Sequence, residues 1–299
     1  NALMTVTSAE DGSFSFDKVP YGIWYVREIS QPKGYVLDNT VYEVNIAEKE
    51  QVVEFEIINE FVRGNITLTK VDADYPDNKL TGAEFEVYKD VNGDGKLDKD
   101  DELLGTLEET SEGIYEMRDL FYGKYLVKET KAPEGFILDK GVYSVFVEED
   151  GKTYSVENKA GVGFINEAMK GSLKIVKTSS DGKVEGFSFR VFGANGFEQI
   201  YKTDKNGEIL IEGLRIGDYT ISEVSDQASS AYILPADKEV TIKADDTTTV
   251  TMHNELRDTP KTGDDTNMSL WYALAGLSAA GIAVTSLIAF RKKKKEGKN

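Results

Sequence analysis

A lysine, a glutamate and an asparagine recur together along the chain, each inside a segment of alternating apolar residues. The sequence holds two complete sets and one set without a lysine: Lys70, Glu129 and Asn166; Lys177, Glu223 and Asn254; Glu28 and Asn59. Burial lowers the pKa of an amine and raises the pKa of a carboxylic acid. A neutral lysine could then attack the asparagine carboxamide, while the glutamate moves protons and hydrogen-bonds the developing oxyanion. Ammonia would leave, and a Lys–Asn isopeptide bond would remain.

Strand phase decides whether these side chains share a face, because successive side chains of a strand point to opposite sides. Lys70 is in phase with Ile66 and Leu68. Lys177, the glutamates and the asparagines are also in phase with apolar neighbours, whereas Lys174 is not. We therefore expect every set to lie on an inward face. A buried Lys–Glu ion pair beside a hydrogen-bonded asparagine would suit the same placement, and phase alone leaves both interpretations open.

The elements that must position these residues belong to an internal repeat. Each of three segments begins with a polar-Gly turn, reaches a glycine and then an aromatic strand, and closes on Asn-Glu. Period-2 alternation predicts antiparallel strands, and no long helical period precedes the C-terminal region. We predict an all-β fold of tandem β-sandwiches. The modules are residues 1–62, the C-terminal part of a truncated domain; residues 64–168; and residues 171–256.

Composition excludes several classes of protein. The 299 residues contain no cysteine, so disulfides, thiol nucleophiles and cysteine-ligated metals are absent. The single histidine, His253, cannot supply the groups of most hydrolytic or metal centres, which argues against an ordinary enzyme. The net charge of −18 disfavours nucleic acid as a partner. The sequence lacks a secretion signal, so we expect it to be the C-terminal part of a longer protein.

The C-terminal region has the pattern of a membrane anchor. Residues 270–290 carry no charged side chain, and the basic tail 291–299 follows directly. About 20 apolar residues cross a bilayer as a helix, and basic residues stay on the cytoplasmic side. We predict one C-terminal transmembrane helix, the alternative being a buried core helix.

The residues around Glu129 resemble the E-box of Gram-positive pilins. Residues 125–136 read YLVKETKAPEGF, and residues 24–35, WYVREISQPKGY, are a looser copy. With the openings LTKVD at 68–72 and GAEF at 82–85, the modules resemble Cna B-type (SpaA-like) domains, which are prealbumin-like, Ig-like β-sandwiches.

The resemblance implies self-formed isopeptide bonds. They would be Lys70–Asn166 promoted by Glu129 and Lys177–Asn254 promoted by Glu223. The third module departs from the family pattern, because VSDQA at 224–228 replaces the Thr-x-Ala-Pro-x-Gly continuation. In the first module the partner lysine of Asn59, with Glu28 as promoter, would lie upstream of Asn1.

A short motif before the apolar span resembles the sortase sorting signal of cell-wall proteins. The linker 257–269 contains this motif, which consists of Thr259, Pro260, Lys261, Thr262 and Gly263. Threonine stands where the LPxTG pattern has leucine. The resemblance implies that sortase cleaves after Thr262 and transfers its carbonyl to a peptidoglycan or pilin amine. A plain transmembrane anchor is the alternative.

Residues 90–101 have the spacing of a calcium-binding loop. No cofactor is required by the chemistry above, but calcium is a candidate ligand here. Its ligands would be Asp90, Asn92, Asp94, the carbonyl of Lys96, Asp98 and Asp101. Expected strands flank the loop, so it would be a hairpin insertion and not an EF-hand. A solvated turn is the alternative.

Together these features predict a cell-wall-anchored surface stalk of a Gram-positive bacterium, either a pilin subunit or an adhesin stem. The expected partners are sortase, a peptidoglycan or pilin amine, and the membrane before sorting. An upstream region would bind a host matrix or cell-surface ligand. A different class remains open, in which the modules are the spacer and anchor of a surface enzyme or carbohydrate-binding protein whose active domain lies upstream.

Overall fold

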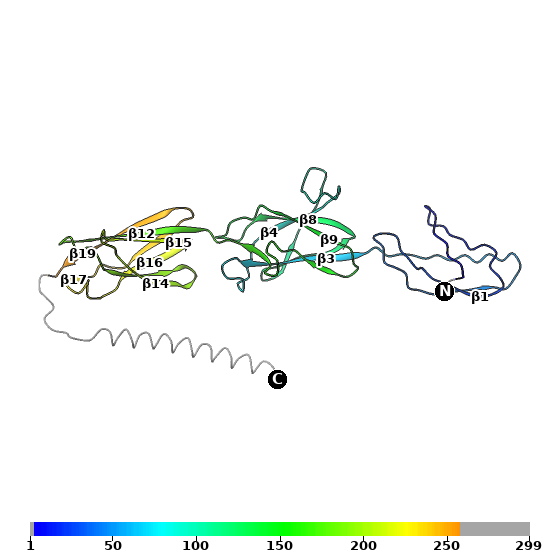
Figure 1. Cartoon of the computed structure of the whole chain (residues 1–299), viewed down its shortest axis with the longest axis horizontal. Coiled ribbons are helices and arrows are strands. Elements are labelled where there is room, and N and C mark those ends of the chain that lie inside the picture. Colours follow the sequence, from blue (N-terminus) through cyan, green and yellow to red (C-terminus); the bar gives the residue numbers. More distant parts are fainter. Residues whose placement is uncertain (1–2, 258–299) are drawn as a thin grey trace, which may run out of the picture. The chain divides into compact units, whose positions relative to one another are not determined.

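The structure, a computed structural model, describes residues 3–257 and is built of β-strands (Figure 1). The only helix in that range is a short 3-10 turn, η1, at Ala194–Gly196. The predicted all-β fold is therefore confirmed. No helix within residues 3–257 is long and apolar enough to cross a bilayer. The predicted span at 270–290 and the sorting motif at 259–263 lie outside the described residues.

The chain divides after Ala168 into two compact units, and each sheet draws its strands from one predicted module. The first module contains one antiparallel pair, β1 (Gly22–Val26) with β2 (Tyr42–Ile46). No residue from 3 to 61 is buried, so this module has no closed core within those residues.

The second module is a sandwich of two sheets, in which the hairpin connections follow the predicted glycine turns. One sheet has the order β5-β4-β8-β9, and the other has the order β10-β3-β7-β6 with β11 also paired to β3. The strands are β3 (Arg63–Asp72), β4 (Glu84–Lys89), β5 (Glu102–Thr106), β6 (Glu108–Ser111), β7 (Ile114–Phe121), β8 (Gly123–Lys131), β9 (Val142–Val147), β10 (Thr153–Ser155) and β11 (Phe164–Asn166).

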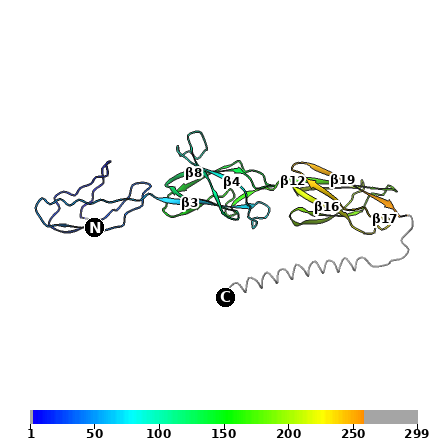
Figure 2. The same ribbon diagram turned by 180° about the vertical axis from the view of Figure 1, so that it is seen from behind.

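The third module repeats this plan (Figure 2). Its sheets have the orders β15-β12-β19-β17 and β14-β13-β16-β18. The strands are β12 (Lys170–Ser179), β13 (Ser188–Gly193), β14 (Phe197–Lys202), β15 (Glu208–Arg215), β16 (Gly217–Glu223), β17 (Tyr232–Ile233), β18 (Lys238–Ile242) and β19 (Thr247–Leu256).

Alternation of apolar residues builds both cores. In the second module the side chains of Ile66, Leu68, Phe85 and Val127 are fully buried. Burying each large aliphatic or aromatic side chain contributes about 1.5–3 kcal/mol. The ring of Phe85 packs edge-on against Phe164, with 5.0 Å between the centroids. Strands of both sheets therefore contribute to one core.

The first and last strands of each complete module run parallel and side by side. In the third module, β12 pairs with β19 from Ser172 opposite Thr247 to Ser179 opposite Asn254. In the second module the last strand is interrupted, because β10 and β11 pair with β3 at separate places and residues 156–163 loop out between them. In both modules this pairing places the asparagine two residues after the residue opposite the lysine, and therefore on the same face of the sheet.

Candidate functional site

Lys70 lies on β3 with its side chain fully buried, as strand phase predicts. Its Nζ donates a hydrogen bond to the carbonyl oxygen of Phe164 at 3.1 Å. Burial lowers the pKa of Lys70 to about 8, although nearby carboxylates, chiefly Glu129, oppose the shift. A neutral amine is therefore far more accessible here than at an ordinary lysine.

Glu129 lies on β8 and is also fully buried. Its two carboxylate oxygens accept hydrogen bonds from Nδ2 of Asn166 at 3.0 and 2.9 Å, and Oε2 also accepts the backbone N–H of Asp139 at 2.7 Å. Burial raises the pKa of Glu129, although these hydrogen bonds and the charge of Lys70 oppose the shift. The carboxyl group is thus biased toward carrying a proton.

Asn166 ends β11, which pairs with the lysine strand β3, and its carboxamide is hydrogen-bonded to Glu129. Besides the bonds to Glu129, its Nδ2 donates to the carbonyl oxygen of Ile137 at 2.8 Å. Its Oδ1 is buried and has no hydrogen-bond partner. An unpartnered buried oxygen is costly in a folded protein, so this one requires an explanation.

A glycine turn holds the backbone of each lysine. The N–H of Lys70 donates to the carbonyl of Gly113, and the N–H of Lys177 donates to that of Gly207, both at 2.7 Å. Both glycines have positive φ, and a Cβ on either would come within 3.0 Å of the lysine carbonyl oxygen. In the two complete modules the glycine of this polar-Gly turn is therefore required by close backbone packing.

The third module assembles the equivalent groups with fewer supporting contacts. Lys177, Glu223 and Asn254 are all buried, and Nδ2 of Asn254 donates to Oε1 of Glu223 at 2.6 Å. Burial lowers the pKa of Lys177 and raises that of Glu223. Oε2 of Glu223 and Oδ1 of Asn254 have no hydrogen-bond partner. Lys174, which strand phase places outward, forms an ion pair at the surface with Glu208.

The first module holds its acid and amide in the arrangement seen around Glu129. Nδ2 of Asn59 donates to Oε2 of Glu28 at 2.8 Å and to the carbonyl of Val36 at 3.0 Å. The backbone N–H of Asp38 donates to the same glutamate oxygen at 2.8 Å. Both side chains are only half-buried. The upstream lysine remains a prediction.

Three functional candidates were not found by strand phase. Asp139, Tyr143 and Asn158 form a hydrogen-bonded group beside Glu129 and Asn166. The sequence does contain a signal for the first two. The second module has an aspartate ten residues after its glutamate and a tyrosine four residues later, and the first module has the same spacing in Glu28, Asp38 and Tyr42.

The acidic loop at 90–101 is stabilised by hydrogen bonds from its own backbone N–H groups and by contacts with Lys124 of β8. The buried carboxylate of Asp90 accepts the N–H groups of Gly93 and Gly95 at 2.7 and 2.9 Å. The ammonium of Lys124 lies 3.2 Å from Oδ2 of Asp90 and donates to the carbonyl of Gly93 at 3.0 Å. Within residues 3–257, no group of three or more acidic, histidine or cysteine side chains is arranged to hold a metal.

Calcium binding at this loop stays a prediction, and the ion would have to displace Lys124 from Asp90. If calcium binds the loop, calcium at about 100 times its dissociation constant should raise the free energy of unfolding by about 2.7 kcal/mol. The check is the melting temperature of the full chain in calcium and in chelator. Asp90→Asn should abolish the response, whereas Asp77→Asn, at an exposed position outside the loop, should keep it. Equal melting temperatures in the unsubstituted chain would contradict calcium binding.

Comparisons with known proteins agree with this architecture. The family described as SpaA, prealbumin-like fold domain, matches residues 1–60, 64–160 and 171–256. The LPXTG cell wall anchor motif matches residues 260–297. No curated protein matches the chain.

Several solved structures are similar to the chain. The TIE protein of Bacillus anthracis is 25% identical with a TM-score of 0.63, and the match covers 83% of this chain and 44% of that protein. The chain therefore spans less than half the length of this relative. The minor pilin of Streptococcus agalactiae is 19% identical, with a TM-score of 0.31 and coverage of 67% and 99%. A streptococcal ancillary pilin is 22% identical, with a TM-score of 0.29 and coverage of 81% and 77%.

The family match covers all three repeats, and the anchor motif follows them at the C-terminal end. The anchor motif identifies attachment to the Gram-positive cell wall. The chain belongs to the SpaA prealbumin-like domain family and is a cell-wall-anchored surface protein.

Proposed function

We propose that the chain is a surface stalk, part of a pilin subunit or an adhesin, whose modules are locked by self-formed isopeptide bonds. The bonds are Lys70–Asn166, promoted by Glu129, and Lys177–Asn254, promoted by Glu223. In the first module Asn59, with Glu28 as promoter, would bond a lysine from a strand outside residues 1–62. Sortase joins Thr262 to a peptidoglycan or pilin amine, and a ligand-binding region upstream provides attachment.

The observation that carries this proposal is the burial of a complete Lys, Glu and Asn set at matching places in two modules. A buried ion pair is the competing explanation for such a set. Within residues 3–257, however, no ion pair joins Lys70 to Glu129, and the amine bonds a backbone carbonyl instead. The carboxamide oxygens of Asn166 and Asn254 both lack hydrogen-bond partners, so each can accept a hydrogen bond from a protonated glutamate.

The lysine, glutamate and asparagine side chains account for every bond and proton of the reaction without a cofactor. The neutral lysine nitrogen attacks Cγ of the asparagine, and the protonated glutamate stabilises the developing oxyanion through a hydrogen bond. The glutamate then carries a proton from the attacking nitrogen to Nδ2. The Cγ–Nδ2 bond breaks, ammonia leaves, and the glutamate is regenerated. Each set turns over once, on its own chain.

The position of the bond gives the stalk its mechanical property. The first and last strands are parallel neighbours, so tension on the two ends of a module would otherwise be resisted by the hydrogen bonds between them and by core packing. A covalent bond between these strands carries that load directly. It also replaces the disulfides that a chain without cysteine cannot form.

The test is the intact mass of the full chain. We expect it to be lower than the sequence mass by one ammonia for each of two bonds. Peptide mapping should then find Lys70 joined to Asn166 and Lys177 joined to Asn254. An unshifted mass in folded protein would refute the crosslinks and leave buried, unjoined side chains as the correct description.

A further inference from the structure

Asp139 connects to the candidate site through both its backbone and its side chain. Its N–H donates to Oε2 of Glu129 at 2.7 Å. Its carboxylate accepts hydrogen bonds from the hydroxyl of Tyr143 at 2.7 Å, from Nδ2 of Asn158 at 2.6 Å and from the N–H of Gly141 at 2.7 Å. Asp139, whose N–H binds Glu129, is therefore itself held by hydrogen bonds from β9 and from the loop at 156–163.

Asn158 extends this connection to the reacting asparagine. Its Oδ1 accepts the N–H of Ile165 at 2.6 Å, and its Nδ2 donates to the carbonyl of the same residue at 2.8 Å. Ile165 directly precedes Asn166 on β11. One continuous set of hydrogen bonds thus runs from Glu129 through Asp139 and Asn158 to the backbone that carries the amide.

The interrupted last strand explains why the second module uses such a network. β11 has three residues and pairs with β3 only from Phe164 to Asn166. In the third module the matching strand, β19, has ten residues and pairs continuously with β12 from Ser172 to Ser179. The residue ten positions after Glu223 is Ile233, and Oε2 of Glu223 has no partner.

The first module supports a specific role for the aspartate and tyrosine. Asp38 clamps Glu28 through its N–H, and the hydroxyl of Tyr42 donates to Oδ2 of Asp38 at 2.6 Å. The same two contacts therefore accompany the glutamate in two modules. The recurrence of both contacts with the same spacing indicates that they serve the glutamate.

We propose that Asp139, Tyr143 and Asn158 are positioning residues that hold Glu129 against Asn166 and thereby set the rate at which the second module forms its bond. This inference rests on the proposed isopeptide chemistry. The three residues do not exchange protons with the reacting atoms. They fix the distance and direction between the acid and the amide, and a misplacement of about 1 Å can cost about 100-fold in rate.

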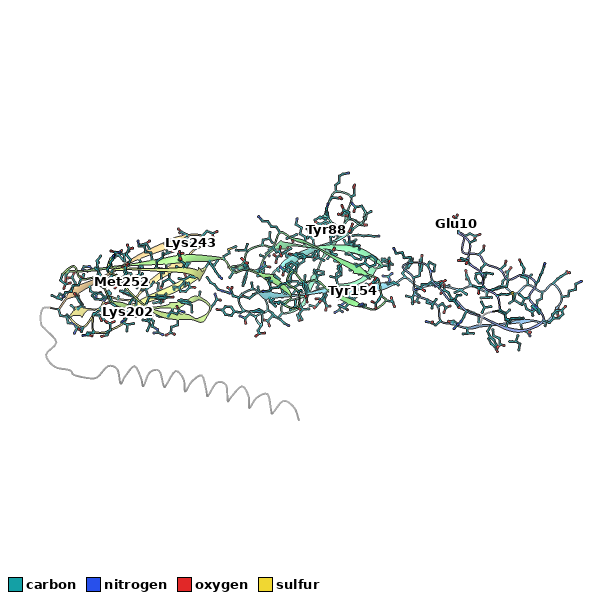
Figure 3. The ribbon with its side chains drawn as sticks, viewed as in Figure 1. Glu10, Tyr88, Tyr154, Lys202, Lys243 and Met252 are labelled. Carbon is teal, nitrogen blue, oxygen red and sulfur yellow. The ribbon has the colours of Figure 1, made fainter. Side chains whose placement is uncertain are left out.

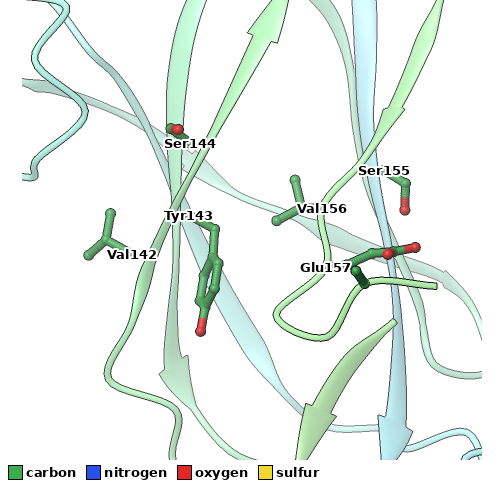
Figure 4. A pocket seen from close by; sticks show the side chains of 7 residues that line it. Val142, Tyr143, Ser144, Ser155, Val156 and Glu157 are labelled. Atoms are coloured by element: carbon green, nitrogen blue, oxygen red, sulfur yellow. The ribbon is translucent and has the colours of Figure 1, made fainter. Parts of the chain in front are cut away.

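The surroundings of Tyr143 make the network testable without disturbing the core. Its side chain stands in an open cleft between β9 and the segment after β10, beside Val156 and Glu157 (Figure 4). Removing the hydroxyl deletes one hydrogen bond and leaves the ring in place. Tyr88 on β4, labelled in Figure 3, provides a matched control, because its hydroxyl donates to the half-buried Glu86, which is not part of the network.

The experiment follows bond formation in the full chain after cell-free synthesis. Samples are quenched and mapped by mass spectrometry, and the Lys177–Asn254 bond of the same molecules serves as the internal reference. We expect Tyr143→Phe and Asn158→Ala to slow the Lys70–Asn166 bond by about 10- to 100-fold, with the reference unchanged. Tyr88→Phe should match the unsubstituted chain. Equal rates for Tyr143→Phe, Asn158→Ala and Tyr88→Phe would overturn the inference.

The pH dependence of the rate of Lys70–Asn166 bond formation distinguishes a positioning role of these residues from a general effect on the stability of the module. Burial raises the pKa of Asp139, but the bonds from Asn158 and Tyr143 outweigh burial and keep its pKa below the usual value. Its negative charge raises the pKa of Lys70 and that of Glu129, which also face each other. The charge of Asp72 also raises the pKa of Lys70. Tyr143, whose pKa burial and its bond to Asp139 raise to about 12, stays neutral.

The reactive pair, neutral lysine and protonated glutamate, is most populated between the pKa values of the two groups. Asp139→Asn keeps the N–H clamp but removes the charge, so both pKa values fall and the rate optimum should move to lower pH. Tyr143→Phe keeps the charge and should lower the rate without that displacement. An Asp139→Asn optimum that does not move would overturn the assigned electrostatic contact. If the unsubstituted chain forms neither bond, the proposed function itself fails, which is a different result from equal variant rates.

Discussion

Replacing Glu129 with alanine should leave Lys70 and Asn166 unjoined, and the full chain should then retain one ammonia that the unsubstituted chain loses. The reason is that this carboxyl group is the only acid hydrogen-bonded to the amide of Asn166 among the described residues. General acid and base catalysis contributes about 10²–10⁴-fold, so bond formation should slow by at least this range. Intact mass and peptide mapping measure the result.

The third module is the internal control in the same molecule, because Lys177–Asn254 should still form. Glu84→Ala is the external control: Glu84 lies on the neighbouring strand β4 and pairs at the surface with Lys131. This variant should keep both bonds. Glu129→Gln preserves the size of the side chain but cannot move a proton, so it should behave as Glu129→Ala does. Complete joining in either Glu129 variant would refute the assigned role.

Lys70→Met should give the second largest effect, a module that folds but is no longer locked. Methionine fills a similar volume without leaving a charge buried, so the loss should reflect the bond itself. By analogy with a disulfide, closing a loop of about 100 residues stabilises by about 4.7 kcal/mol. A change of 1 kcal/mol moves the melting temperature of a domain this size by about 4–8 °C, so a fall of roughly 20–40 °C is expected.

Force spectroscopy on the full chain gives a second, more direct measurement of Lys70→Met. An unlocked second module should release a loop of about 100 residues, which at about 3.3–3.6 Å per residue extends by roughly 330–360 Å. The locked module cannot release that length at any force that leaves covalent bonds intact. Lys128→Met, at a half-buried position on β8, should behave as the unsubstituted chain does. Release of the full length by the unsubstituted second module would contradict the lock.

Local periodicity predicted a large part of the site. Lys70 is buried and Lys174 lies at the surface, as their strand phases indicate. The all-β fold followed from the same alternation and was confirmed. The acidic loop shows where local spacing is insufficient, because its pattern of oxygen donors predicts a calcium site but gives no sign of Lys124, which comes from β8 and contacts Asp90.

The sequence by itself determined which side chains share an inward face, how many modules follow one another and where the wall anchor lies, because each depends on neighbours within a few residues or on a linear motif. Only the tertiary structure decided that Asn166 lies beside the lysine strand, and that Asp139 and Asn158 join Glu129 to the broken last strand. Pairing between distant strands depends on register and loop length, which a period of two residues does not specify. The repeated spacing of the aspartate and tyrosine after the glutamate marks two members of the network, but their connection through Asn158 to the strand of Asn166 was visible only in the tertiary structure.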